Sequence, residues 1–589
     1  MGCRLVSAWI VLPAFIFKTL LFLAALCAGP VHALTVEVVA PEEIKTLLMQ
    51  YLETARAARL GERMDAEEMA RLQRQSDLTA RDLLATEGYF SPQVESAVEW
   101  VGDDWRVDYR IVPGVRTLVR SVKLGFDGAW KTGEEQATLR ARIERSFPLK
   151  PGMPFRQADW DMAKLVVLRP LLVDTYPTAQ ISASEARIDP ATHTADLTLT
   201  LDSGPAFVYG APVITGVQRY PEAIVRNLNS MRPGQAYRQQ DLLDYQAMLE
   251  ASSYYAQATV SVDLDPRLAS ALPIQVEVLE RPEKRFSVGA GVSTDTGARV
   301  QASWLHRDIL DRGMRLKFDT RIETRRQTGS AELAWPRNAH GYENSLGVQL
   351  KQEDIEGQKT RSTVLAAKRT RTRGQIETTL SLQYQTEEQR IANVVNAGNQ
   401  ALTLNYGWTQ RKVGRDFYPR RGYVLSVQGG GALESLLSDT SFLRLYGRHV
   451  QYFPVGRNGR LVLRGELGSV LAQSRDGIPT DFLFRAGGDN SVRGYAYQSL
   501  GRTLNGAVES VRTLATGTVE YNYFFDRNWG MALFVDAGDA ADSPASLSPV
   551  LGYGVGARYS SPVGPINLDL AYGEATQKFR LHFSLGLSF

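Results

Sequence analysis

The sequence predicts an α+β region of three repeated modules, followed by an all-β, sixteen-stranded antiparallel transmembrane barrel. Three observations predict this fold class. A short motif recurs in the first half of the chain, segments of alternating polarity fill the second half, and residues 579–589 continue that alternation. At 589 residues, the chain is also too long for one ordinary hydrophobic core.

Residues 1–33 are predicted to be a secretion signal peptide. A basic start precedes the short apolar core TLLFLAALCAG (19–29), and VHA (31–33) offers small residues at a cleavage site. An N-terminal membrane anchor is the alternative. Both cysteines of the chain, Cys3 and Cys27, lie in this segment, so its removal would leave an exported protein without thiols.

The region from residue 34 to 283 repeats one unit. Helix-like stretches such as EEIKTLLMQYLETARAARL (42–60) alternate there with short strands, and PGMPFRQAD (151–159) matches PGQAYRQQD (233–241). Repetition of such a motif indicates one supersecondary unit that has been copied. We therefore expect three βααββ-like modules, near residues 34–115, 116–205 and 206–283.

The region 285–589 has the pattern of an outer-membrane barrel. In GMRLKFDTRIE (313–323), apolar or small residues alternate with five charged ones, so the two faces of the strand differ. A soluble β-sandwich, the alternative, would not usually carry five charges along one strand face. In a membrane barrel, charged residues face a wet lumen and apolar residues face lipid. Sixteen such segments fit between Phe286 and Phe589.

The first and last strands are expected to pair, because lipid cannot satisfy a free strand edge. The first strand is FSVGAGVS (286–293), in which Gly289 and Gly291 lie on the lumen face. Interior glycines weaken a strand and allow another backbone to come close. The last strand, FRLHFSLGLSF (579–589), therefore forms one side of a seam, and its pattern could also be an address that an assembly machine reads.

A long loop, FRAGGDNSVRGYAYQSLG (484–501), separates the eleventh and twelfth segments, and it lies outside the barrel or folds back inside. Alternation in the next two strands turns Glu520 and Asp536 towards the lumen. Arg493 of the loop could fold inwards and bridge these carboxylates through charge-assisted hydrogen bonds. A solvated arginine is the ordinary alternative.

Composition argues against several functional classes. The formal net charge is +3 and no basic block stands out, so the chain lacks the electrostatic footprint of a nucleic-acid-binding protein. The histidines after residue 33 are scattered without metal-ligand spacing, and no nucleophile elbow or phosphate-binding loop is recognisable. We expect no enzyme activity, cofactor or metal; a barrel-borne hydrolase or protease is the alternative.

Four motifs occur in the order that one family shows. GGD with SVRGY (487–495) is similar to a VRGY/F loop signature, and FVDAG (534–538) to an F-x-D-x-G strand motif. DFYPRRGY (416–423) and SPVGPINLDLAYG (561–573) are similar to two further signatures. The whole chain after residue 33 thus resembles the superfamily of outer-membrane assembly and translocation barrels typified by BamA, and three modules make it most similar to the TamA type.

The resemblance implies roles for individual residues. The repeats would be POTRA domains, and the gating loop would comprise Val492, Arg493, Gly494 and Tyr495. Its arginine would have acidic partners at Asp536 and Glu520. The β-signal would extend from Phe579 to a terminal aromatic at Phe589, with a seam kink at Gly586.

The resemblance also implies a function. The chain would be an outer-membrane protein with its modules in the periplasm, inserting unfolded β-barrel clients, such as autotransporters, into the lipid bilayer through the seam. An inner-membrane-anchored partner of the TamB type would be expected, and no nucleic acid. A two-partner-secretion polypeptide transporter and a passive porin are the alternatives, although a diffusion pore gains nothing from three periplasmic modules.

Overall fold

The computed structural model describes residues 34–589 except 63, 103, 131–133, 392–393, 396–397, 415–417, 563 and 589. The predicted signal peptide lies outside the described residues. The chain forms two compact units, one comprising the chain up to Ala211 with 232–241 and 262–273, and the other comprising the remainder. Among the described residues, no helix has the length and hydropathy needed to cross a bilayer.

The first module is a three-stranded sheet with three helices. Its strands, β1 (Leu34–Val39), β2 (Gln93–Val101) and β3 (Asp104–Val112), lie in the order β1-β3-β2. The helices are α2 (Glu42–Tyr51), α3 (Glu53–Leu60) and α4 (Ala66–Thr86). The stretch 42–60, which the sequence predicts as one helix-like segment, is broken because Leu52 has extended backbone angles and is fully buried.

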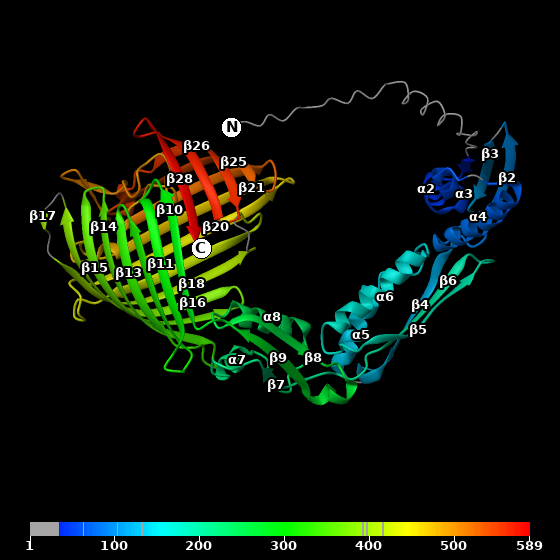
Figure 1. Ribbon diagram of the computed structural model, residues 1–589, viewed down its shortest axis with the longest axis horizontal. Helices are drawn as coiled ribbons and strands as arrows, with labels where there is room; N and C mark the ends of the chain where they lie inside the picture. The colour runs from blue at the N-terminus through cyan, green and yellow to red at the C-terminus, as the bar shows by residue number, and fades with distance from the viewer. Residues whose placement is uncertain are drawn as a thin grey trace, which may run out of the picture. The chain divides into compact units, whose positions relative to one another are not determined.

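The second module repeats this sheet order with two helices. Strands β4 (Leu118–Asp127), β5 (Gln180–Asp189) and β6 (Thr194–Asp202) lie in the order β4-β6-β5, with η1 (Gly128–Trp130), α5 (Glu134–Ser146) and α6 (Gln157–Leu172) between β4 and β5. Helix α6 lies along the sheet (Figure 1) and shares one buried cluster with β6. Burial of this apolar face stabilises the module.

The third module has the order β7-β9-β8. Its elements are β7 (Tyr209–Thr215), α7 (Ala223–Leu228), α8 (Gln239–Ala251), β8 (Tyr255–Val262), η2 (Pro266–Ala271) and β9 (Leu272–Glu280). Each of the three sheets therefore places the last strand of its module between the other two.

The repeated Pro-Gly motif has the same structural role in the second and third modules. Gly152 and Gly234 both have positive φ angles, +88° and +81°, and each donates its N–H over 2.8 Å to the first strand of its module. The aromatic residue three positions later is buried in both cases (Phe155 and Tyr237). The motif recurs because each copy closes the same turn against the same strand.

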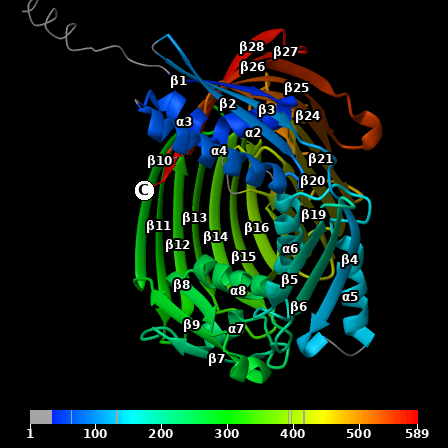
Figure 2. The same cartoon turned by 90° about the vertical axis from the view of Figure 1, so that its right-hand side faces the viewer.

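The second half of the chain is a closed antiparallel barrel, which confirms the predicted fold class. Among the described residues it contains sixteen long strands, and β11 to β16 lie side by side in chain order (Figure 2). The strands are β10 (Lys284–Ser293), β11 (Gly297–Ile309), β12 (Met314–Glu323), β13 (Arg326–Ala334), β14 (Tyr342–Ile355), β15 (Gln358–Arg373), β16 (Ile376–Ile391), β18 (Asn399–Val413), β19 (Gly422–Ala432), β20 (Phe442–Val455), β21 (Gly459–Leu471), β24 (Thr513–Phe524), β25 (Trp529–Ala541), β26 (Val550–Ser561), β27 (Gly564–Gly573) and β28 (Lys578–Ser588).

Shorter elements lie in the connections between the barrel strands. A two-residue strand, β17 (Val394–Val395), extends the pairing of β16, and the hairpin β22 (Arg502–Leu504) and β23 (Ala507–Glu509) forms a separate small sheet. Two 3-10 turns, η3 (Thr480–Phe482) and η4 (Pro544–Ser546), complete the described elements.

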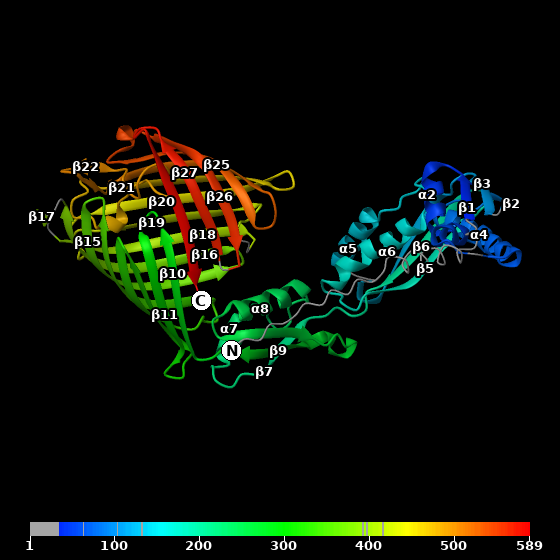
Figure 3. The same cartoon turned by 45° about the horizontal axis from the view of Figure 1, so that its top comes forward.

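The barrel closes by pairing β10 with β28, as the sequence predicts. The two strands lie next to each other in two views (Figures 1 and 3), and residues Gly289–Ser293 pair with Ser584–Ser588. Apolar side chains of both strands point outwards, with 67% of Phe286 and 53% of Leu581 exposed. The alternating pattern therefore separates a lipid face from a lumen face.

Part of the third module is fixed to the turn between β11 and β12. Tyr254 donates its hydroxyl to the carbonyl of Gly313 over 2.6 Å. Arg307, which is 3% exposed, donates to the carbonyls of Ser253 and Pro282 over 2.5 and 2.7 Å. Both donors are buried and bonded, so they hold this part of the module against the barrel.

Candidate functional site in the barrel lumen

The long loop between β21 and β24 folds into the barrel. Glu520 of β24 and Asp536 of β25 face the lumen, because their neighbours Val519 and Val535 are about half exposed on the outer surface. Arg493 of the loop reaches both carboxylates and is only 2% exposed. Of the two positions that the sequence allows for this loop, the structure has the internal one.

Arg493 forms the centre of a buried ion-pair network. Its Nε and Nη2 donate to the two oxygens of Asp536 over 2.7 and 3.0 Å, and its backbone N–H donates to the same carboxylate over 3.0 Å. Its Nη1 donates to Glu520 over 2.7 Å and to Asp569 over 3.1 Å. The guanidinium carbon also lies 3.4 Å from the centre of the Phe534 ring. Every side of the cation is therefore occupied.

A second arginine completes the network. Arg558 of β26 donates to Asp569 of β27, and over 3.2 Å to Glu520. Sequence reasoning missed Arg558 and Asp569. Asp569 could have been found by alternation, because its neighbours Leu568 and Leu570 face outwards, which turns the carboxylate inwards. Arg558 follows from the same rule, applied to β26.

The residues around Arg493 seat the loop on the barrel wall. Gly494 has a φ of +94°, and a Cβ there would lie 2.8 Å from the backbone nitrogen of Gly573. Tyr495 donates its hydroxyl to the carbonyl of Leu551 over 3.0 Å, and Val492 is fully buried. Only glycine permits this approach of loop to strand.

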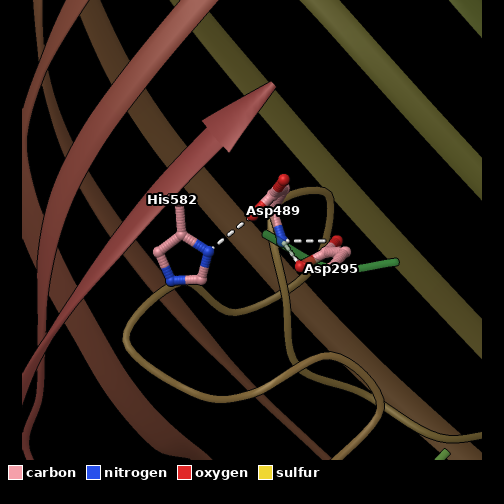
Figure 4. A group of neighbouring side chains, drawn as sticks. All are labelled: Asp295, Asp489 and His582. Carbon is pink, nitrogen blue, oxygen red and sulfur yellow. Dashed lines mark hydrogen bonds and ion pairs between the residues drawn. The ribbon is translucent and has the colours of Figure 1, made fainter. Parts of the chain in front are cut away.

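A second cluster, here called the seam latch, consists of Asp295, Asp489 and His582 (Figure 4). Asp295 lies in the turn after β10, His582 lies on β28, and Asp489 belongs to the loop. His582 Nδ1 contacts Asp489 Oδ1 at 2.6 Å, and the backbone N–H of Asp489 donates to both Asp295 oxygens over 3.0 and 3.2 Å. The latch therefore ties the loop to both strands of the seam.

The seam latch fits a shared proton better than a metal ion, although its three side chains offer ligand atoms within 4.8 Å of one another. The other ring nitrogen of His582, Nε2, accepts the backbone N–H of Gly494 over 2.9 Å. Nε2 therefore carries no proton, and Nδ1 donates its own proton to Asp489. A metal on Nδ1 would move that proton to Nε2, where it would face the N–H of Gly494.

Burial and neighbouring groups shift the pKa values of both acids of the seam latch in opposite directions. Burial and the neighbouring Asp489 charge raise the pKa of Asp295 to about 7. Burial also acts on Asp489, but its hydrogen bond to His582 holds the pKa of that carboxyl below its usual range. Arg325, which donates to the Asp295 carbonyl over 3.3 Å, is the cation that faces Asp295 from the next hairpin.

These shifts predict that the latch weakens as pH rises through about 7. A raised pKa means that the closed latch holds the Asp295 proton more tightly than the open one, so closure is favoured below pH 7, while Asp489 stays charged. Hydrogen exchange of the β10 and β28 amides, corrected for intrinsic rates, should be faster at pH 8 than at pH 6. Asp295→Asn should remove this difference, whereas Asp319→Asn, elsewhere in the lumen, should keep it. An unchanged pH response in Asp295→Asn would contradict the assignment.

The remaining seam residues predicted from sequence lie as follows. Gly289 pairs with Ser588 and Gly291 with Gly586. A Cβ at Gly291 would lie 2.7 Å from the carbonyl oxygen of Leu585, so a side chain there would push the strands apart. Phe579 is 72% exposed on the outer surface. Phe589 lies outside the described residues.

Comparisons with known proteins give three kinds of likeness. A family model described as the Omp85 superfamily domain matches residues 283–589. The chloroplastic outer envelope protein 80 of Arabidopsis thaliana is 34% identical over 110 residues. That match spans 18% of this chain and only 14% of the relative.

Solved structures are similar to this chain at low sequence identity. BamA from Haemophilus ducreyi lacking POTRA domains 1–3 is similar with a TM-score of 0.60 and 16% identity, over 80% of this chain and all of that chain. CdiB from Escherichia coli has a TM-score of 0.49 and 11% identity, over 90% of this chain and all of that one. At such identities, the likeness to BamA shows the fold.

Proposed function

Because this chain belongs to the Omp85 superfamily of outer-membrane barrels, we propose that it is a TamA-type assembly factor that inserts β-barrel clients such as autotransporters through the seam between β10 and β28. Family membership places the barrel in the outer membrane, with the N-terminal modules in the periplasm, and in the class of insertion and secretion barrels. The client type and the route through the seam are our proposal.

The short pairing at the seam is the observation that carries the proposal. Strand β10 pairs with β11 over its whole length, Lys284–Ser293, but with β28 only over Gly289–Ser293. The described seam ladder therefore has five register pairs, against ten between β10 and β11. A shorter ladder has fewer hydrogen bonds to break, so a client strand can pair with the backbone of β10 in place of β28, which gives affinity with little sequence preference.

The loop is suited to control this seam. Its Arg493 network holds it to β24, β25 and β27, and its Asp489 belongs to the seam latch. A movement of the loop would therefore strain both the network and the closure of the first and last strands. We assign Val492, Arg493, Gly494 and Tyr495 to a gating loop on this ground.

The modules are suited to receive unfolded clients. Each sheet has two edge strands, and β2 (Gln93–Val101) ends in two exposed apolar residues, Trp100 and Val101. Such edges can bind extended chains by strand addition. By resemblance to TamA-type proteins, we further propose a TamB-like, inner-membrane-anchored partner that docks on the first module.

The function is tested by comparing outer-membrane proteomes of cells with and without the protein. We expect selected autotransporters or other barrels to be lost from the membrane fraction, and full-length protein to restore them. Loss of one secreted polypeptide from the medium, with an unchanged membrane proteome, would instead indicate a two-partner-secretion transporter. Loss of small-solute uptake alone would indicate a porin.

The same complemented strains test the proposed partner. Full-length protein and a variant without residues 34–115 are each purified after cross-linking in cells. The inner-membrane protein recovered with the full-length chain should be absent with the deletion variant. Equal recovery with both would remove the first module from the docking site.

A further inference from the structure

Three arginines occupy the outer face of β15 at one end of the barrel. Leu365 is 51% exposed on the outer surface, and Arg369, Arg371 and Arg373 follow it at even spacing along the strand. Alternation therefore places all three arginines on the lipid face. Because β15 runs antiparallel to its neighbours, it ends on the side of the barrel where β10 begins after the third module.

The position of these arginines marks a level in the membrane. An arginine on the lipid face costs about 2–4 kcal/mol at the bilayer midplane and roughly 0–1 near the interface. Three arginines in succession therefore lie at the height of the lipid headgroups, where phosphate is the principal anion. That level belongs to the leaflet on the side of the modules.

These arginines lack protein anions. Arg369 Nε donates to the side-chain oxygen of Asn344 over 2.8 Å, and the guanidiniums of Arg369 and Arg371 lie 5.6 and 4.8 Å from the ring centre of Tyr342. In the part of the chain that the structure describes, none of the three arginines forms an ion pair. Two cations on one aromatic ring, without a carboxylate, leave a charge that only an outside anion can balance.

An apolar groove begins beside the arginines. Ala367 stands in register between Leu346 of β14 and Leu382 of β16, and both leucines are about half exposed. The small side chain between two large ones leaves a cavity of about 490 Å³, which Trp335 and Leu404 also line. The groove is on the lipid face, so an acyl chain is the material that meets it.

We propose that this surface is a binding site for an anionic phospholipid of the module-side leaflet. The lipid phosphate contacts Arg369 and Arg371, and one acyl chain lies in the groove over Ala367. A phospholipid has a phosphate at one end and a long apolar tail. On the outer surface of the barrel, the arginines lie at the end of β15 and the leucines of the groove lie next to them, towards the membrane interior. The site depends on the membrane location of the barrel and is independent of client insertion.

The test measures lipid retained by the full-length protein in native mass spectrometry, with phosphatidylglycerol and phosphatidylcholine added in detergent. Phosphatidylglycerol should be retained in preference, and Arg369→Gln with Arg371→Gln should reduce its retention about 25-fold, since each basic residue near a lipid surface adds about fivefold. Ala367→Phe, which fills the groove and keeps the charge, should also reduce it. Inorganic phosphate should not displace the lipid.

The matched control is Arg361→Gln. Arg361 lies on the same face of β15 at the opposite end, where its register partner on β16 is Glu388. This variant should retain phosphatidylglycerol like the unmodified protein, and heat-modifiable migration should show that all variants are folded. Equal retention of both lipids, equal loss in the Arg361→Gln control, or displacement by inorganic phosphate would overturn the proposal.

Discussion

Replacing Arg493 with alanine is expected to abolish most client assembly while the barrel still inserts. The substitution leaves Asp536, which has no exposed surface, without its bidentate partner. Among the described residues, Glu520 and Asp569 then keep Arg558 as their ion-pair partner. Breaking a buried pair by removing one partner costs about 3–5 kcal/mol. That cost is sufficient to release a loop from the barrel wall, whereas the strand ladders of the barrel are untouched.

Two measurements detect the release of the loop from the barrel wall. Client assembly is scored by the amount of folded client in the outer membrane, and loop position by the conductance of the purified barrel in a planar bilayer. We expect assembly to fall and conductance to rise. Arg493→Lys should fail as well, because a single ammonium cannot bind both oxygens of Asp536.

A double-mutant cycle separates pairing from independent roles. Arg493→Ala and Asp536→Ala should each impair assembly, and the double mutant should be little worse than the poorer single mutant, because both remove one interaction. Arg448→Ala is the matched control, since Arg448 pairs with Glu466 at 2.9 Å on the lumen face outside the loop. Fully additive losses from Arg493 and Asp536 would show that the two residues act separately.

Locking the seam with a disulfide is expected to stop client insertion without preventing the protein's own folding. Val292 and Leu585 are register partners across β10 and β28. Directly opposed residues in an antiparallel pair have Cα atoms about 4.5–5.5 Å apart, within disulfide range. Cysteines at these two positions should therefore cross-link, and the lock should prevent a client strand from entering between the first and last strands.

The chain provides clean controls for this lock. Residues 34–589 contain no cysteine. Cysteines at Ala290 and Val300 link β10 to β11 instead, where no opening is proposed. Client insertion should stop only in the oxidised seam variant and return with reductant, whereas the β10–β11 lock should have no effect. Full activity of a quantitatively locked seam would remove lateral opening from the mechanism.

The order of the parts and the inward direction of single side chains could be predicted from sequence, because both depend on local periodicity. Strict alternation marks the barrel strands and turns Glu520 and Asp536 inwards. The same alternation turns Asp569 and Arg558 inwards, but which lumenal charges meet depends on the order of the strands around the barrel.

Other features depend on which strands become neighbours. Asp295, Asp489 and His582 are far apart in the chain, and they meet only because the barrel closes and the loop folds inwards. Closure pairs strands that are far apart in the chain. The entropy cost of bringing them together cannot be inferred from the pattern of any short segment. The arginines of KRTRTR (368–373) lie on the lipid face by alternation. The groove beside them exists only because three strands bring Leu346, Ala367 and Leu382 together.

By itself, the amino-acid sequence determined the repeated modules, the alternating strands and the side of each strand on which a residue lies. Only the tertiary structure decided that the loop lies inside the barrel, that a histidine and two acids join it to the seam, and that a groove over β14, β15 and β16 lies beside the arginines. The physical reason is the separation along the sequence over which each kind of interaction acts. Periodicity acts between residues two or three positions apart, whereas ion pairs and grooves form between strands brought together by closure of the whole sheet.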